Sequence, residues 1–400
     1  MKKILYICEL NPFQISSGGH QRTNLLCRAL SEKNHVDIIC FTTDDDLSND
    51  SKIKNSSIIY LEKRPEETSN YILRLFQKLK RILCFFLPTL LVTKSDDYCL
   101  KKIREVLINN TYDYIVVRYL PTAIKFGLNF DKKLIIDLDD LPEQVFRSEM
   151  KLPCKNLFEK ITRKPYYFML SKAAKKHTNR LVKKVNHVFL PDEKQCLLFE
   201  NASYLPNIPY PREKWIDEEH IMSSFNKEIM FVGKLSHTPN LFGVDYFIEK
   251  IWPIIITKIP SAHFNIIGSY MPFNMTEKWT KIKGVNVVGY VEELAAEYKK
   301  NSIIIAPLYH GAGTNIKVLE AMQMARACVV TKYACKGFEN ILQNEKNILI
   351  SETDSEFAEK VITILLNDEY NLYIRKNAVE VIKQNFSYEK FCQLVQEQVS

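Results

Sequence analysis

The chain has 400 residues, of which 46% are hydrophobic, and it carries a formal net charge of +8 at pH 7. This length favours two or more domains, and the apolar content is enough for two sizeable cores. No stretch approaches the roughly 18 uninterrupted apolar residues of a membrane span, which argues against an integral membrane protein. The ten cysteines are scattered without a C-x-x-C pair, so we expect reduced thiols in a cytoplasmic protein rather than disulfides or a zinc site.

The first half of the chain alternates apolar runs with helical patterns, which is typical of an α/β domain. Its predicted strands are residues 3–8, 35–41, 57–61, 112–118, 134–137 and 187–190. Gly18 and Gly19 stand where the first strand leads into a predicted helix over residues 21–30. Glycine permits close backbone approach and a helix N-terminus attracts anions, so the pair indicates an anion site; a plain strand–helix turn is the alternative.

Two strongly basic segments precede residue 185. Residues 71–94 carry a net charge of +5 and residues 151–184 a net charge of +10. Both are predicted to be largely helical, and the helix over 71–87 has wide apolar coverage. Such segments suit an anionic membrane surface, where each Lys or Arg contributes about 1 kcal/mol; the solvated edge of a core helix is the alternative. No RNA-binding motif accompanies them, so we expect no nucleic-acid partner.

Three acidic residues, Asp137, Asp139 and Asp140, follow the predicted strand 134–137. The carboxyl end of a parallel strand is where α/β folds place ligands, so these side chains are candidates to orient a substrate hydroxyl. Alternatively, Asp139 and Asp140 cap the next helix. An Asp-x-Asp pattern also invites a metal site, but the rest of the chain lacks a supporting pattern and we expect no metal.

A polar, proline-containing stretch over residues 205–227 separates the two halves. The predicted strands of the second half are residues 229–232, 263–268, 286–289, 303–306, 327–331 and 347–350. Its predicted helices are residues 242–258, those that begin at 355 and 369, and a last helix over 388–398.

The most informative segment of the second half is residues 303–322. It combines a run of β-branched residues, a turn that contains Gly311 and Gly313, and a predicted helix. The helix N-terminus would attract an anion such as a diphosphate. Lys317 and Glu320 are three residues apart and share one helix face, where they could hold a phosphate and a ribose hydroxyl. An ordinary strand–turn–helix with a surface Lys–Glu pair is the alternative, because a lone Gly-x-Gly is a weak signal.

These motifs resemble the donor-binding signature of the family-4 retaining glycosyltransferases. The resemblance rests on Ala306–Leu308, Gly311–Thr314, Lys317–Met322, Val329–Thr331, Gly337–Glu339, Met230–Leu235, Pro239–Asn240, Phe247–Ile248, Ile251–Pro253 and Val288–Val291. It covers nearly the whole C-terminal half and extends more loosely to the N-terminal half. It implies the GT-B fold, an α/β architecture in which two Rossmann-like, doubly wound domains face one another across a cleft.

The resemblance also implies a domain plan. Residues 1–205 would form an N-terminal Rossmann-like acceptor-binding domain, and residues 206–385 a C-terminal Rossmann-like nucleotide-sugar-binding domain. Residues 386–400 would form a terminal helix that packs back on the first domain.

The same resemblance assigns residues to the donor site. Glu320 would bind the ribose, Lys234 and Lys317 would bind the phosphates, and the turn after strand 286–289 would hold the base through its backbone. The full set of donor-binding candidates is Gly18, Gly19, Lys234, Asn240, Tyr290, Val291, Gly311, Gly313, Thr314, Lys317, Leu319 and Glu320. Asn240 stands where the family often has a second basic residue, so Lys317 would carry more of the diphosphate charge.

The implied reaction is transfer of a hexose-type sugar, with retention, from a nucleotide-sugar to a hydroxyl. Placed donors and cations would stabilise the leaving diphosphate. The catalytic candidates are Asp137, Asp139, Lys317 and Glu320. One position departs from the family, because many members have a glutamate where this chain has Ala312. A non-catalytic glycosyltransferase-like partner subunit would fit this departure and stays open as an alternative. A GT-B-type nucleotide-sugar epimerase, which would also have twin Rossmann domains, stays open as well.

Family habit also suggests the acceptor and the location. The acceptor would be a lipid-linked oligosaccharide or a growing bacterial surface polysaccharide, such as lipopolysaccharide or capsule. The enzyme would be cytoplasmic and peripheral on the inner face of the cell membrane, held there by its basic N-terminal-domain helices. No cofactor is expected besides the nucleotide-sugar substrate.

Overall fold

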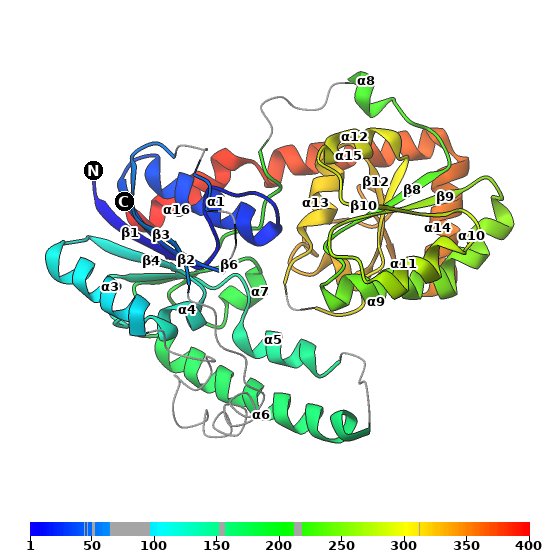
Figure 1. The fold of residues 1–400 in the computed structure, drawn as a ribbon. Helices are drawn as coiled ribbons and strands as arrows, with labels where there is room; N and C mark the ends of the chain where they lie inside the picture. The colour runs from blue at the N-terminus through cyan, green and yellow to red at the C-terminus, as the bar shows by residue number, and fades with distance from the viewer. Residues whose placement is uncertain are drawn as a thin grey trace. The chain divides into compact units, whose positions relative to one another are not determined.

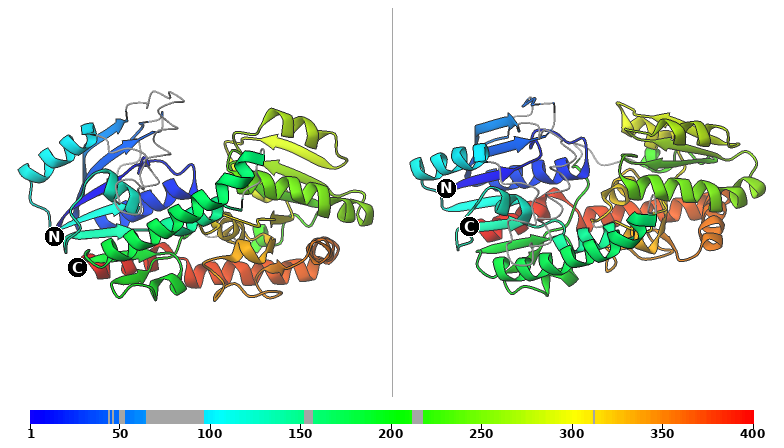
Figure 2. Two further views of the ribbon diagram at one scale, coloured as in Figure 1. Left: turned by 90° about the horizontal axis from the view of Figure 1, so that it is seen from below. Right: turned by 60° about the horizontal axis from the view of Figure 1, so that its bottom comes forward.

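Two parallel sheets organise the chain in the computed structural model (Figures 1 and 2). The structure describes residues 1–43, 45, 47–49, 53–64, 97–151, 157–211, 218–311 and 313–400, without the side chains of 157–160, 219 and 220. Residues 1–207 and 388–400 form unit 1, and residues 208–387 form unit 2. The domain boundaries predicted after residues 205 and 385 lie two residues from these divisions.

Unit 1 contains a seven-stranded parallel sheet. Its strands are β1 (Lys3–Cys8), β2 (His35–Thr42), β3 (Ser56–Lys63), β4 (Tyr114–Arg118), β5 (Leu134–Asp137), β6 (His187–Leu190) and β7 (Ala202–Tyr204). In the strand order β3-β2-β1-β4-β5-β6-β7, the chain adds β2 and β3 on one side of β1 and β4 to β7 on the other, so the order reverses between β1 and β4. Sequence analysis missed β7, because three half-buried residues carry too little periodicity for a prediction.

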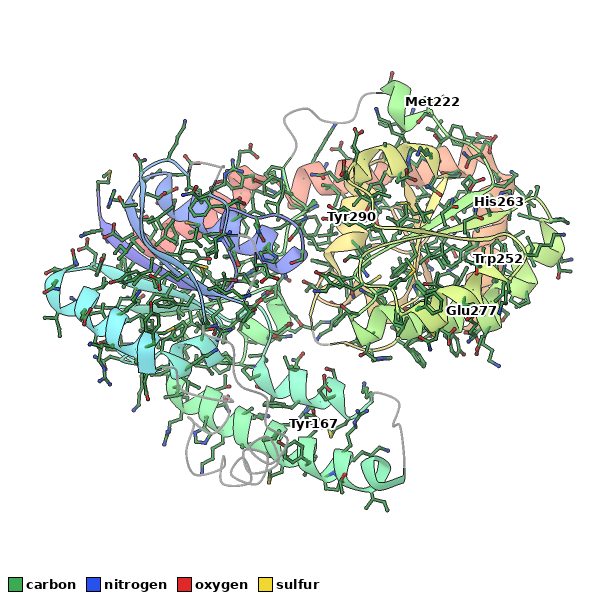
Figure 3. The ribbon with its side chains drawn as sticks, in the orientation of Figure 1. Tyr167, Met222, Trp252, His263, Glu277 and Tyr290 are labelled. Carbon is green, nitrogen blue, oxygen red and sulfur yellow. The ribbon has the colours of Figure 1, made fainter. Side chains whose placement is uncertain are left out.

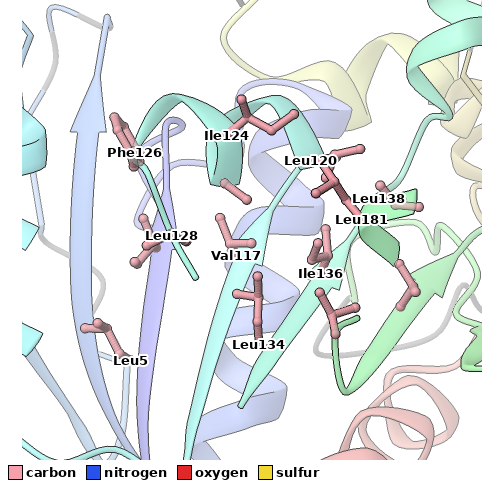
Figure 4. Packing of buried hydrophobic residues seen from close by; sticks show 14 of the residues in the cluster. Leu5, Val117, Leu120, Ile124, Phe126, Leu128, Leu134, Ile136, Leu138 and Leu181 are labelled. Carbon is pink, nitrogen blue, oxygen red and sulfur yellow. The ribbon is translucent and has the colours of Figure 1, made fainter. Parts of the chain in front are cut away.

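Helices flank this sheet, as Figures 1 and 2 show. They are α1 (Gly18–Ser31), α3 (Asp97–Asn109), α4 (Leu120–Lys125), α5 (Pro142–Glu149), α6 (Leu157–Val182), α7 (Glu193–Cys196) and α16 (Tyr388–Val399). Apolar residues of β4, β5 and α4 pack together in the core shown in Figure 4, among them Val117, Ile136 and Leu120. The helix predicted over 71–87 lies outside the described residues.

The terminal helix α16 belongs to unit 1 and packs on α1. The Gln396 amide donates to the carbonyl of Ala29 at 2.5 Å and accepts from the Asn34 amide at 3.3 Å. At the end of the chain, the Lys2 ammonium donates to the Ser400 carbonyl at 2.8 Å. The first and last residues therefore lie together in this unit.

Unit 2 contains a six-stranded parallel sheet. Its strands are β8 (Glu228–Val232), β9 (His263–Ile267), β10 (Val285–Gly289), β11 (Ile303–Ala306), β12 (Ala327–Thr331) and β13 (Leu349–Ser351). The order β10-β9-β8-β11-β12-β13 repeats the reversal of unit 1, here between β8 and β11. Both sheets are therefore doubly wound, as predicted, and such folds bind ligands beyond the carboxyl ends of the strands at the reversal.

The helices of unit 2 connect these strands. They are α8 (Glu218–Ile221), α9 (Thr238–Tyr246), α10 (Trp252–Lys258), α11 (Phe273–Thr280), α12 (Leu294–Lys300), α13 (Ile316–Gln323), α14 (Asp354–Leu366) and α15 (Asp368–Asn385), with a 3₁₀ turn η4 (Lys332–Cys335). The helix predicted over 242–258 is interrupted by a π-helical turn, Phe247–Ile251. The physical reason is Pro253, which has no N–H to donate and shifts the hydrogen-bond register before it.

Candidate functional site

The reversal point of unit 2 brings the end of β8 against the first turn of α13. Gly233 follows β8, and a Cβ atom there would lie 2.7 Å from the Lys317 ammonium nitrogen and 2.9 Å from the Asn240 amide nitrogen. Both distances are shorter than a real Cβ contact, so only glycine lets these polar groups approach the strand end. At the reversal point, the side chains of Lys317 and Asn240 thus pack against the backbone of Gly233.

Lys317 is half-buried in this site. Its ammonium donates to Asn240 Oδ1 at 2.6 Å and lies 4.6 Å from the centre of the buried Phe231 ring. Asn240 Nδ2 donates to the Lys234 carbonyl at 2.8 Å, which fixes the amide with its oxygen toward the lysine. Burial lowers the pKa of Lys317 to about 7, although Glu320 opposes the shift. Because burial disfavours the ammonium form of Lys317, an anion bound beside it would stabilise that form.

Further polar groups lie near Lys317. Partial burial lowers the pKa of His237, and the proximity of Lys317, His310 and Lys234 lowers it further. The Asn315 side chain at the start of α13 donates to the Ala334 carbonyl at 3.3 Å and does not cap the helix. The N–H groups of the first turn of α13 therefore add to a positive potential that suits a phosphate or diphosphate.

The turn between β11 and α13 is anchored by the segment that follows β12. The Thr331 hydroxyl donates to the Leu308 carbonyl, and the Tyr333 hydroxyl donates to the Gly311 carbonyl. Gly311 has a φ of +147°, a backbone conformation that favours glycine. Gly313 and Thr314 are half-buried in the same turn. Ala312 lies outside the described residues.

The remaining unit 2 candidates differ in exposure. Glu320 is half-buried on α13, whereas the Leu319 side chain is fully buried in the core, so only its backbone could serve a ligand. Tyr290 and Val291 directly follow β10, and Tyr290, labelled in Figure 3, is largely exposed. Lys234 is also exposed, and its ammonium lies 4.7 Å from the centre of the Tyr270 ring.

In unit 1 the end of β5 carries a buried ion cluster. Arg22 of α1 donates to Asp137 through Nε at 2.9 Å and Nη2 at 2.6 Å, and Arg118 at the end of β4 donates to the same carboxylate at 2.5 Å. All three side chains are fully buried or nearly so. Asp137 has no exposed surface and accepts hydrogen bonds from both arginines at the reversal point.

Asp139 forms the outer part of this cluster. Its carboxylate accepts from Arg118 Nη2 at 3.1 Å, from the Tyr119 hydroxyl at 3.2 Å and from Asn207 Nδ2 at 3.0 Å. Burial raises the pKa of Asp139, but Arg118 and Arg22 outweigh that effect and hold the pKa below its usual value. Its side chain keeps 13% exposure, and its backbone has a left-handed φ of +54°.

The Gly18-Gly19 pair forms the start of α1, whose N-cap is Ser17. The Ser17 hydroxyl accepts from the His20 N–H at 3.4 Å. A Cβ atom at Gly19 would lie 2.9 Å from Leu10 Cδ1, the end of a side chain that could shift to make room. The predicted contact of the glycine pair with a diphosphate stays a prediction.

Comparisons with known proteins bear on this site. Residues 226–367, which contain the entire unit 2 site described above, match the family model described as "Glycosyl transferases group 1". The match covers most of unit 2. It is also 25% identical, over 98% of both chains, to a Klebsiella pneumoniae protein described as "Uncharacterized 44.6 kDa protein in cps region".

Solved structures show that the whole chain has the GT-B glycosyltransferase fold. Sucrose-phosphate synthase from Thermosynechococcus elongatus matches with a TM-score of 0.67 and 14% identity over 99% of this chain and 98% of that chain. HepE from Anabaena, solved in complex with UDP-glucose, matches with a TM-score of 0.62 and 12% identity over 100% and 99%. WaaG, described as a glycosyltransferase involved in lipopolysaccharide biosynthesis, matches with a TM-score of 0.63 and 14% identity over 98% and 99%.

Sequence analysis missed several residues that shape the candidate sites of the two units. Arg22 and Arg118 hold Asp137 from 115 and 19 residues away, and His237 lies near Lys317 in unit 2. The available signals were Arg22 on the apolar face of a predicted helix and Arg118 at the end of an apolar strand. Neither position indicates which carboxylate the arginine contacts.

The structure adds two observations on metals and membranes. Among the described residues, no group of three or more His, Cys, Asp or Glu side chains could hold a metal ion. None of the helices in the described ranges has both the length and the apolar character to cross a membrane.

Proposed function

We propose that this glycosyltransferase moves a hexose-type sugar, with retention, from a nucleotide-sugar to a hydroxyl of a lipid-linked or growing bacterial surface polysaccharide. The observation that carries the donor assignment is the cationic reversal point of unit 2. Positive charge comes from Lys317 and Lys234, and N–H groups come from the first turn of α13. Among the described contacts, the Lys317 ammonium makes its hydrogen bond to an amide oxygen and not to a carboxylate. A diphosphate fits this chemistry, and HepE, a protein of the same fold, binds UDP-glucose.

In this proposal Lys317 does the main electrostatic work of catalysis. Cleavage of the anomeric C–O bond leaves negative charge on the departing diphosphate, and a cation fixed by Asn240 would stabilise that charge as it develops. Glu320, one turn farther along α13, would accept hydrogen bonds from the ribose hydroxyls. Retention would follow from attack on the face that the diphosphate leaves, with the departing phosphate accepting the proton, so no protein nucleophile is needed.

The unit 1 cluster has a separate proposed role. Asp139 keeps an ionised, partly exposed carboxylate that could orient a sugar hydroxyl, whereas Asp137 is buried beneath it. We assign Asp137 to positioning, through Arg118, which contacts both carboxylates. The Klebsiella relative in a cps region and the fold likeness to WaaG support a surface polysaccharide as the product.

The donor site is tested with two variants. Lys317→Ala and Glu320→Ala should each lower turnover at least tenfold, because each removes a charge-assisted contact to the donor, which is worth about 1.5–3 kcal/mol. Lys281→Ala, which removes an exposed lysine of the same unit, is the control. Unchanged rates in both site variants would reject the assignment.

A thermal-shift screen across UDP-, GDP-, ADP- and CMP-sugars identifies the donor. Release of nucleotide without acceptor then separates the enzyme from the alternatives. A competent transferase should release nucleotide slowly, whereas a non-catalytic partner subunit would release none and an epimerase would return an isomerised nucleotide-sugar.

Membrane association is a further part of the proposal. Helix α6 exposes Ile161 by 65% and Phe168 by 56%, and the Lys172 ammonium lies 5.4 Å from the centre of the Phe168 ring. Exposed apolar side chains beside lysines suit the boundary of an anionic membrane. Flotation with phosphatidylglycerol liposomes should weaken at high salt and in Phe168→Ala. Flotation that ignores salt would contradict an electrostatic contribution.

A further inference from the structure

Tyr270 has a backbone conformation that is rare for a bulky residue. It lies in the loop between β9 and α11 with a φ of +56°, a left-handed conformation that glycine and asparagine adopt more easily. Its side chain is 72% exposed, so core packing does not explain the strain. Strained residues persist where the surrounding structure holds them, and they gather at functional sites.

The loop that carries Tyr270 is attached to the strand end of the donor site. The Leu235 N–H donates to the Ser269 carbonyl at 2.9 Å, and the Gly233 N–H donates to the Ile267 carbonyl at 3.0 Å. A Cβ atom at Gly268 would lie 1.9 Å from the Gly233 carbonyl oxygen. The backbone that carries Tyr270 and the backbone that carries Lys234 are therefore in direct contact.

The Tyr270 ring is the contact that restrains Lys234. The ammonium of this exposed lysine lies 4.7 Å from the ring centre, within the range of a cation–π interaction. An exposed lysine otherwise samples many rotamers and loses that freedom when it binds a ligand. A carboxylate could also restrain it, but a carboxylate would neutralise the charge and compete with a diphosphate. An aromatic face holds the ammonium and leaves its charge available.

We propose that Tyr270 is a positioning residue, which holds the Lys234 ammonium toward the donor diphosphate at the expense of backbone strain. The inference rests on the proposed donor site. It extends that site by one element, the β9–α11 loop.

The test uses three variants of Tyr270 and inorganic pyrophosphate, which carries the diphosphate common to UDP-, GDP- and ADP-sugars. Tyr270→Ala and Tyr270→Gly should weaken pyrophosphate binding about 2- to 5-fold, the equivalent of a surface cation–π contact. Tyr270→Phe should bind within twofold of the wild type. Phe273→Ala, which removes an 83% exposed aromatic ring from the start of α11, is the matched control and should not change binding.

Thermal stability supplies the readout for strain. Ala and Gly at position 270 both lack the ring, but only Gly is free of the left-handed penalty. The Gly variant should therefore melt about 2–4 °C above the Ala variant. In a Lys234→Met background, Tyr270→Ala should have no further effect on binding, because the two residues act through one contact.

The outcomes separate the inference from the proposed function. If Lys317→Ala binds pyrophosphate as the wild type does, the donor site itself is wrong. If Lys317→Ala weakens binding and the Ala and Gly variants of Tyr270 do not, only the inference is overturned. The same holds if Tyr270→Ala weakens binding equally with and without Lys234.

Discussion

The lowered pKa of Lys317 predicts that donor binding takes up a proton. The pKa of this lysine is about 7 in the free protein, so at pH 8 it is about 90% neutral. A bound diphosphate would stabilise the ammonium and return its pKa toward the ordinary value of 10.5. The affinity should therefore fall about 50-fold between pH 7 and pH 9, because a growing share of the protein must first be protonated.

Isothermal titration of UDP-glucose measures both effects, since the diphosphate of this donor has no group that titrates in the range. Parallel titrations at pH 8 in Tris and in HEPES should report an uptake of about 0.9 protons per site, from the difference in buffer ionisation heat. Lys317→Met retains a long apolar side chain and should bind weakly, with no pH dependence. Equal wild-type affinity at pH 7 and pH 9, with Lys317→Met weakened, would refute the reasoning.

The same pKa predicts the sign of a stability change in the protein without donor. The folded-state pKa of about 7 is below the ordinary lysine value of 10.5, so between these pH values the unfolded chain binds more protons than the folded chain. The contribution of Lys317 to the free energy of unfolding should therefore rise from pH 7 to about pH 10.5 and level off above it. Lys317→Met should remove this contribution, which denaturant titrations of both proteins would measure.

Three further changes test the packing of the two units. Asp137→Asn leaves the buried Arg22 and Arg118 with Asp139 alone as counter-charge and should lower the stability of unit 1 by about 3–5 kcal/mol in urea titration; a loss below about 1 kcal/mol would show that the cluster is hydrated. Gly268→Ala places a Cβ atom 1.9 Å from the Gly233 carbonyl and should abolish soluble expression; a variant that is soluble and stable would contradict this contact. Gln396→Ala removes the bond to the Ala29 carbonyl and should cost about 1 kcal/mol, with earlier proteolysis of the last helix as the readout.

The sequence by itself determined the fold class. Runs such as residues 3–8 and 303–306 are short, β-branched or apolar, and bounded by polar turns, so each predicts a buried parallel strand from local information. The glycines at 311 and 313, with Lys317 and Glu320 at helical spacing, likewise mark a strand–turn–helix that can bind an anion. These features depend on residues within one element or its neighbour, which a single chain displays directly.

Only the tertiary structure decided the environment of each candidate side chain. Asp137 and Asp139 are two residues apart, yet Arg22 and Arg118 bury the first while the second retains exposed surface. The closeness of Gly233 to Lys317, and of Lys234 to Tyr270, likewise depends on how the strands are ordered in the sheet. Burial and ion pairing arise between segments far apart in the chain, and residue spacing records the periodicity of each segment without recording which segments meet.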